Sequence, residues 1–110
     1  MNESHMKREI LETPAMLRRE AVAWEAQAQR IRRLGAGRPN VVLIGRGSSG
    51  NACTFGSYLF MLRTGRHPME FHPWVTTQTL PDADWSDTVA YAFSASGHST
   101  DITEALRWLK

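Results

Sequence analysis

Residues 41–52 read Val-Val-Leu-Ile-Gly-Arg-Gly-Ser-Ser-Gly-Asn-Ala, and this stretch decides the fold. Its first four residues are a continuous apolar run with β-branched side chains, and Pro39 and Asn40 precede it as turn residues. Such a run is typical of a strand that is buried on both faces, as in a parallel sheet. A glycine- and serine-rich turn follows, and the apolar residues of 52–62 then recur at spacings of 3, 4 and 3, which predicts a helix.

The same order of elements continues toward the C-terminus. Residues 69–74 predict a second strand, 75–87 a connector with room for a helical turn, and 88–93 a third strand. Ser94-Ala-Ser-Gly-His-Ser99 comes next, and a third helix follows with Ser99 as its N-cap. Because strands alternate with helices, the sequence predicts a three-layer α/β/α fold with a parallel sheet.

The N-terminal segment predicts helices of a different kind. Residues 6–12 favour a short helix, and Pro14 should end it because the residue before a proline is driven away from helical backbone. Thr13 and Pro14 then suit the start of a second, amphipathic helix to about Arg33. Its apolar stripe, more often core than interface, is Leu17, Ala21, Trp24, Ala28 and Ile31. We therefore divide the chain into a helical segment, 1–38, and a sheet-containing part, 39–110.

Composition bounds the class of protein. With 110 residues, 42% of them hydrophobic and 22% charged, the chain predicts a small globular protein. The polar N-terminus and the lack of a long apolar run argue against secretion and membrane insertion, so we expect a cytoplasmic protein. The single cysteine, Cys53, and the histidines lack metal-ligand spacing, so no metal site is expected. The thirteen basic residues are interspersed with eleven acidic ones, which favours solvated helix faces over nucleic-acid binding.

Two loops carry the chemical signal, residues 45–50 and 94–99. Each follows a predicted strand and opens a helix, where free backbone N–H groups and the helix dipole attract an anion. Glycines let the backbone approach closely, and serine hydroxyls add donors. Either loop alone is often only a tight turn or an ordinary cap, but two on one sheet favour a phosphate site. Arg46 is a candidate anion clamp or an exposed side chain.

A dinucleotide site is the rival interpretation of the first loop. Gly45, Gly47 and Gly50 match the G-x-G-x-x-G pattern between a strand and a helix. That pattern also needs an acidic residue near the end of the second strand. Glu70 has the right separation, but the predicted strand places it at the opposite edge of the sheet. We therefore expect no bound cofactor.

Three segments show a family resemblance: Met6-Lys-Arg-Glu-Ile-Leu-Glu-Thr-Pro14, residues 41–52 and Ser94-Ala-Ser-Gly-His-Ser-Thr-Asp101. The chain resembles the sugar isomerase (SIS) domain family, most closely the isomerase half of glucosamine-fructose-6-phosphate aminotransferase and related glucosamine-6-phosphate deaminases. The resemblance implies a flavodoxin-like α/β/α fold that binds phosphosugars. The positions that match the family's phosphosugar-binding residues are Gly47, Ser48, Ser49, Ser94, Ser96, Gly97 and Ser99.

The chain also departs from the family pattern. Ala95 stands where glutamine is common, and His98 where glutamate is common. The family sheet has about five strands, whereas this sequence predicts about three. The resemblance therefore implies a truncated sheet. The family's acid and base residues come later in the chain, so no catalytic residue is assigned here. Glu104 is an unsupported candidate base that we expect to face solvent.

The resemblance implies the N-terminal part of a sugar-phosphate isomerase, aminotransferase or deaminase acting on fructose 6-phosphate or glucosamine 6-phosphate. A non-catalytic phosphosugar sensor is the first alternative, a dinucleotide-binding domain the second, and a remnant without a ligand remains open. Whether the chain is itself an enzyme is also open. A second copy or a tandem SIS domain is the partner that the resemblance implies.

Overall fold

The computed structural model describes residues 4–78 and 80–110. The chain forms two compact units, one ending at Ala36 and the other running from Gly37 to Lys110. The first unit is the helix α1 (His5–Gly35). The second unit contains β1 (Asn40–Ile44), α2 (Ser48–Thr64), β2 (Met69–Phe71), the short 3-10 helix η1 (Pro73–Thr77), β3 (Thr88–Ala92) and α3 (Thr100–Trp108).

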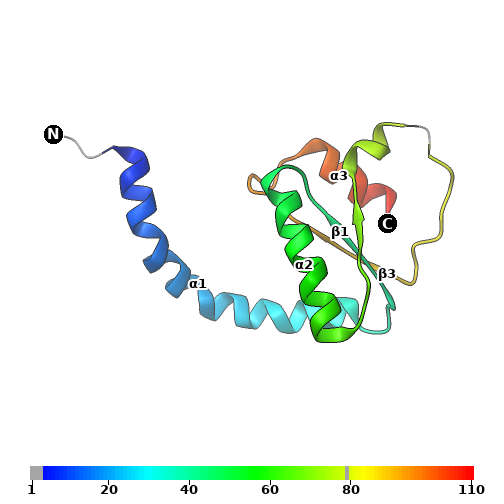
Figure 1. Ribbon diagram of the computed structural model, residues 1–110, viewed down its shortest axis with the longest axis horizontal. Helices are drawn as coiled ribbons and strands as arrows, with labels where there is room; N and C mark the ends of the chain where they lie inside the picture. Colours follow the sequence, from blue (N-terminus) through cyan, green and yellow to red (C-terminus); the bar gives the residue numbers. More distant parts are fainter. Residues whose placement is uncertain (1–3, 79) are drawn as a thin grey trace. The chain divides into compact units, whose positions relative to one another are not determined.

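The strands form one parallel sheet in the order β2-β1-β3, so β1 lies in the middle (Figure 1). In the register of this sheet, Leu43 lies between Glu70 on β2 and Tyr91 on β3. All four apolar residues of β1, Val41 to Ile44, are at most 4% exposed. The prediction of a doubly buried central strand is therefore confirmed.

Helices cover both faces of this sheet. Alternate side chains of a strand point to opposite faces, so Val41 and Leu43 pack with Cys53 of α2, whereas Ile44 packs with Ile102 and other residues of α3. Phe71, Trp85 and Trp108 add an aromatic cluster on the α3 side, with ring centroids 5.7 and 5.2 Å from that of Trp108. The predicted three-layer α/β/α fold is confirmed.

The prediction that Pro14 ends a first short helix is wrong. Residues 5–35 form one helix with Pro14 inside it, and Figure 1 shows α1 changing direction along its length. A break would create two helix ends, each with four unpaired backbone groups, whereas one internal proline costs about 3 kcal/mol. The Thr13 hydroxyl also donates to the carbonyl of Glu9 over 3.0 Å, which supports the turn before the proline.

The apolar stripe of α1 was expected to belong to a core more often than to an interface, and α1 is the helix that makes up the described part of the first unit. No described side chain of α1 is buried, and Leu17 and Ile31 are each 44% exposed, with Trp24 at 49%.

The second strand is shorter than predicted. It ends at Phe71, and Pro73 begins η1 two residues later. Proline has no N–H for a strand ladder, but its fixed backbone angle suits the first turn of a helix. The helical turn expected in the connector therefore begins earlier than the sequence indicated.

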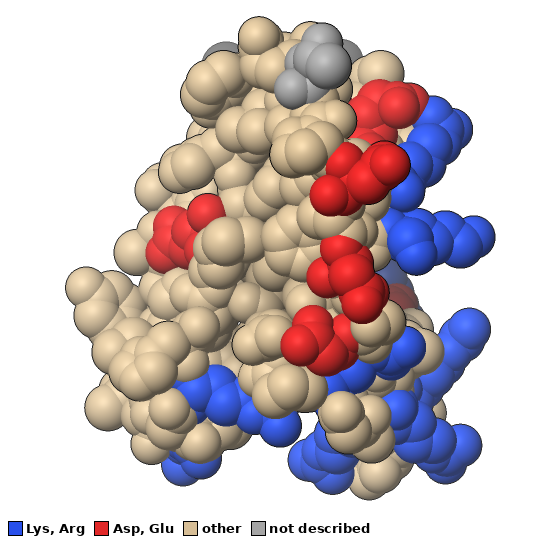
Figure 2. All heavy atoms as spheres, turned by 90° about the vertical axis from the view of Figure 1, so that its right-hand side faces the viewer, with Lys and Arg blue, Asp and Glu red and all other residues tan. Residues whose placement is uncertain are grey.

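The surface and the helices carry two further observations. Acidic and basic side chains both occur on the face that Figure 2 presents. Within residues 4–78 and 80–110, no helix combines the length and the apolar character that crossing a membrane requires.

Candidate functional site

The two loops singled out in the sequence lie at the same edge of the sheet, where β1 and β3 end side by side. The N–H of Phe93 donates to the carbonyl of Ile44 over 2.8 Å, so the two chains are still bonded where the loops begin. The Arg46 guanidinium then donates to a carboxylate oxygen of Asp101 over 2.7 Å. This ion pair joins the first loop to the first turn of α3.

The first loop passes very close to α2. A Cβ atom on Gly45 would lie 2.5 Å from the carbonyl oxygen of Ser49 and 2.9 Å from the sulfur of Cys53. Gly47 is the N-cap of α2 with a φ angle of +52°, a backbone conformation that favours glycine. Ser48 is the first residue of the helix, so this loop places the serines in the first turn of α2.

The second loop is folded by its own serines. The Ser94 hydroxyl accepts from the N–H of Gly97 over 3.0 Å, and the Ser96 hydroxyl accepts from the N–H of His98 over 3.1 Å. Ser99 is the N-cap of α3, as its sequence context predicts, but its hydroxyl makes no capping bond. It lies 3.4 Å from the hydroxyl of Ser94 instead. Two hydroxyls are thus paired beside the start of α3.

Two cavities open at this edge of the sheet. The smaller, about 260 Å³, lies at the start of α3 and is lined by Ser94, Gly97 and Ser99, among others. The larger, about 530 Å³, has Gly47 in its wall. Ser48, Ser49 and Ser96 line neither. Three of the seven predicted residues therefore line the smaller cavity, and Gly47 lines the larger one. The three remaining serines lie in the two loops but outside both cavities.

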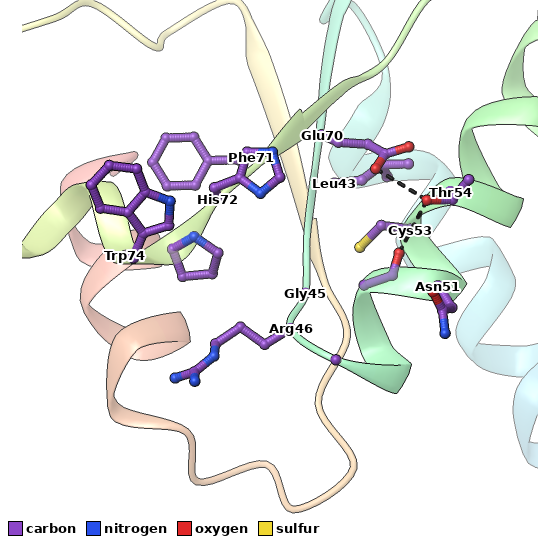
Figure 3. Close-up of a pocket in the computed structure, with 13 residues that line it drawn as sticks. Leu43, Gly45, Arg46, Asn51, Cys53, Thr54, Glu70, Phe71, His72 and Trp74 are labelled. Atoms are coloured by element: carbon purple, nitrogen blue, oxygen red, sulfur yellow. Dashed lines mark hydrogen bonds between the residues drawn. The ribbon is translucent and has the colours of Figure 1, made fainter.

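The larger cavity also contains residues outside the seven predicted phosphosugar-binding positions (Figure 3). Trp74, which is 62% exposed, and His72 lie on one side of it, and Arg46 extends beside them. Glu70 lies on the side of α2, where it accepts hydrogen bonds from the hydroxyls of Thr54 over 3.2 Å and Ser57 over 3.0 Å. The aromatic side chain beside polar groups makes this cavity suitable for a polar ring.

Glu70 corrects an expectation from the sequence. It was expected at the edge of the sheet opposite the glycine loop, but it lines the larger cavity together with Gly45, Gly47 and Gly50. The error came from extending the second strand to Trp74, which moved Glu70 toward its start. Treating Pro73 as the start of a helix would have shown that Glu70 lies in the middle of a three-residue strand.

The ion pair fixes the charge state of Asp101. The hydrogen bond from Arg46 lowers the pKa of the Asp101 carboxyl below its ordinary value, and this outweighs the effect of partial burial, which raises it. Asp101 also accepts from the N–H of Ile102 over 3.0 Å. Arg46 itself is 71% exposed, so it remains accessible to solvent and to a ligand while it holds Asp101.

We expect the Arg46→Gln substitution to raise the pKa of Asp101 toward its ordinary value. The lowered pKa stabilises the fold above about pH 4, and this contribution is lost as the pH falls through the folded-state pKa. The variant should therefore lose less stability on acidification. Carboxyl carbon NMR would measure the pKa. Asp84, whose pKa is lowered by the backbone N–H and hydroxyl of Ser86, is an internal control and should titrate unchanged; an unchanged Asp101 would contradict the assignment.

The site does not provide a thiolate or a metal cage. Burial, with the nearby charge of Glu70, raises the pKa of the Cys53 thiol, so Cys53 stays protonated at neutral pH. Among the residues that the structure describes, no group of three or more His, Cys, Asp and Glu side chains is placed to hold a metal ion.

Comparison with known proteins places this arrangement in a class. The fold is similar to that of a phosphosugar isomerase-like α/β protein. The chain is similar to a crystal structure from Silicibacter pomeroyi DSS-3 described as a "putative phosphosugar isomerase", with a TM-score of 0.80 and 29% sequence identity. The match covers 97% of this chain and 33% of that one, so the chain spans about a third of its neighbour's length. No family model and no curated protein matches the chain.

Proposed function

We propose that the chain binds a phosphosugar, with its phosphate at the start of α3. The observation that carries this proposal is the pair of hydroxyls of Ser94 and Ser99, 3.4 Å apart in a cavity wall that also includes Gly97. The Ser99 hydroxyl is not used for capping, so it is available to a ligand. Helix N-termini bind phosphate groups through backbone N–H groups and the helix dipole.

The remaining predicted residues complete this proposal. Ser96 belongs to the same loop, and Gly47, Ser48 and Ser49 form the start of α2, the neighbouring helix at the same edge. The ion pair of Arg46 and Asp101 joins the first loop to the first turn of α3, next to the second loop. We assign the sugar portion of the ligand to the side of the first loop. The similarity to the Silicibacter pomeroyi structure supports this ligand class.

We further propose that the ligand is fructose 6-phosphate or glucosamine 6-phosphate. We propose that the chain acts as the N-terminal part of a sugar-phosphate isomerase, aminotransferase or deaminase. Moving a proton between sugar carbons requires a base within hydrogen-bond reach. Near the site, Glu70 is bonded to Thr54 and Ser57, Asp101 to Arg46, and Glu104 to Arg107. These engaged carboxylates favour binding without turnover by this chain alone, as in a sensor. A cytoplasmic setting fits the free thiol of Cys53.

Thermal unfolding with a ligand panel tests the proposal. The panel contains fructose 6-phosphate, glucosamine 6-phosphate, inorganic phosphate and NAD. At a ligand concentration of 100 Kd, binding should stabilise the chain by about 2.7 kcal/mol, or raise Tm by about 10–20 °C for a unit of this size. We expect a sugar phosphate to give the largest shift. A shift with NAD alone would support the dinucleotide alternative instead, and no shift with either sugar phosphate would refute the proposal.

Serine variants locate the binding in the same experiment. Ser99→Ala and Ser96→Ala should each weaken sugar-phosphate binding about tenfold or more, because a hydrogen bond to a charged group contributes roughly 1.5–3 kcal/mol. Ser99→Ala is the cleaner variant because it removes no capping bond. Ser86→Ala is the matched control, since Ser86 precedes β3 and thus lies at the other end of the sheet. Unchanged affinity in both loop variants would exclude this loop as the phosphate site.

A further inference from the structure

The larger cavity has two sides that differ in charge (Figure 3). Arg46 and Trp74 lie on one side, and Asp101 pairs with the Arg46 guanidinium over 2.7 Å. Glu70 lies on the other side, against α2. Among the residues that the structure describes, Glu70 belongs to no ion pair. The cavity is therefore balanced in charge on the Arg46 side and negative on the Glu70 side.

The carboxylate of Glu70 is held in place but is not neutralised. One of its oxygens accepts from the hydroxyl of Thr54 and the other from that of Ser57, and both donors are uncharged. A carboxylate has about four acceptor positions, so about two remain for a ligand. The charge also acts inside the cavity, because after burial it is the main cause that raises the pKa of the Cys53 thiol in the cavity wall. This side of the cavity therefore favours a cationic group.

We propose that Glu70 determines the specificity of the phosphosugar site and selects a sugar phosphate that carries an ammonium group. The inference rests on the proposed binding of the phosphate at the start of α3. Arg46 lines the larger cavity and also bonds to the first turn of α3, so the cavity adjoins that phosphate position. The sugar ring then lies along Trp74, with its ammonium group at Glu70.

Electrostatics fix this orientation of the ligand. An ammonium group and a carboxylate form a charge-assisted hydrogen bond, which is about twice as strong as a neutral one. A hydroxyl at the same position of the sugar is an uncharged donor to Glu70 and binds more weakly. A phosphate placed there would be repelled by the like charge. Of the two ligands proposed above, the geometry therefore favours glucosamine 6-phosphate over fructose 6-phosphate.

Glucosamine 6-phosphate and glucose 6-phosphate test the inference, because they differ only in an ammonium or a hydroxyl group on one ring carbon. Calorimetric titration of the full chain at about pH 7 keeps most of the amine protonated. We expect the native chain to bind the amino sugar about tenfold more tightly. Glu70→Gln should weaken binding of the amino sugar about tenfold, to nearly the affinity of glucose 6-phosphate.

Asp87→Asn is the matched control for Glu70→Gln. It also replaces a carboxylate by an amide, but Asp87 precedes β3 and so lies at the other end of the sheet. This variant should keep the native preference. Equal affinity of the native chain for the two sugars, or a preference that survives Glu70→Gln, would overturn the role of Glu70 and leave phosphosugar binding intact. Binding of neither sugar phosphate would overturn both proposals.

Trp74→Ala tests where the ring lies without changing the charge of the cavity. It should weaken binding of both sugar phosphates about fivefold or more, as removal of an aromatic contact does, and leave their ratio unchanged. Unchanged affinity for both would overturn the placement of the ring in the larger cavity. Urea unfolding of each variant separates a loss of binding from a loss of folding.

Discussion

The Gly45→Ala substitution should lower the free energy of unfolding by about 1–3 kcal/mol, the cost of forcing an extra carbon into a packed site. The new Cβ atom would lie 2.5 Å from the Ser49 carbonyl oxygen and 2.7 Å from its carbon. Both are backbone atoms of α2, so the clash cannot be relieved by rotating a side chain. Either the helix start or the end of β1 must move, and we expect weaker sugar-phosphate binding as well. Urea unfolding and ligand titration measure the two effects.

Gly56→Ala is the matched control for this prediction. A Cβ atom there meets only the end of the Leu43 side chain, at 3.3 Å, which can shift slightly. Glycine inside a helix is less favourable than alanine by about 1 kcal/mol, so this variant should be neutral or more stable. If Gly45→Ala were as stable as Gly56→Ala, the close approach of β1 to α2 would not constrain the site.

The second large effect concerns Leu43, the residue at the centre of the sheet. It is 1% exposed and lies on the middle strand, so Leu43→Ala should cost about 2–5 kcal/mol. Against a total stability of about 5–15 kcal/mol, that loss is a large fraction. The urea midpoint should fall while the m-value stays the same, because the surface exposed on unfolding changes little.

A double variant gives this prediction a sharper form. Because a Cβ atom on Gly56 points at the Leu43 side chain, Gly56→Ala should partly fill the space that Leu43→Ala leaves. Gly56→Ala should therefore stabilise the Leu43→Ala protein more than it stabilises the native protein, and the two changes should not be additive. Strict additivity would show that the two residues are not in contact across the α2 layer.

The sheet and its layers could be predicted from the sequence because they depend on local patterns. Val41 to Ile44 are apolar at every position and rich in β-branched residues, which is typical of a strand covered on both faces. The two wrong predictions of element bounds both involve a proline, Pro14 and Pro73. The effect of a proline depends on the free-energy cost of the backbone structure that would replace it. At Pro14 two extra helix ends cost more than a kink, and at Pro73 a missing ladder bond ended the strand early.

The site could be predicted only to the level of its loops. The sequence shows that 45–50 and 94–99 follow strands, and parallel strands bring such loops to one edge. It does not show that Arg46 pairs with Asp101, 55 positions away, because that pairing depends on β1 and β3 being neighbours. Nor does it separate Ser99, whose hydroxyl is unused by its helix, from Ser96, which bonds to His98.

The hydrogen bond from Phe93 to Ile44 has a consequence for how the site moves. The two loops start from a bonded point between β1 and β3, so the sheet sets the place where both loops begin. Core strands open only with a free energy close to that of global unfolding. A ligand that binds between loops anchored on this strand therefore stabilises the whole second unit and not only the loops.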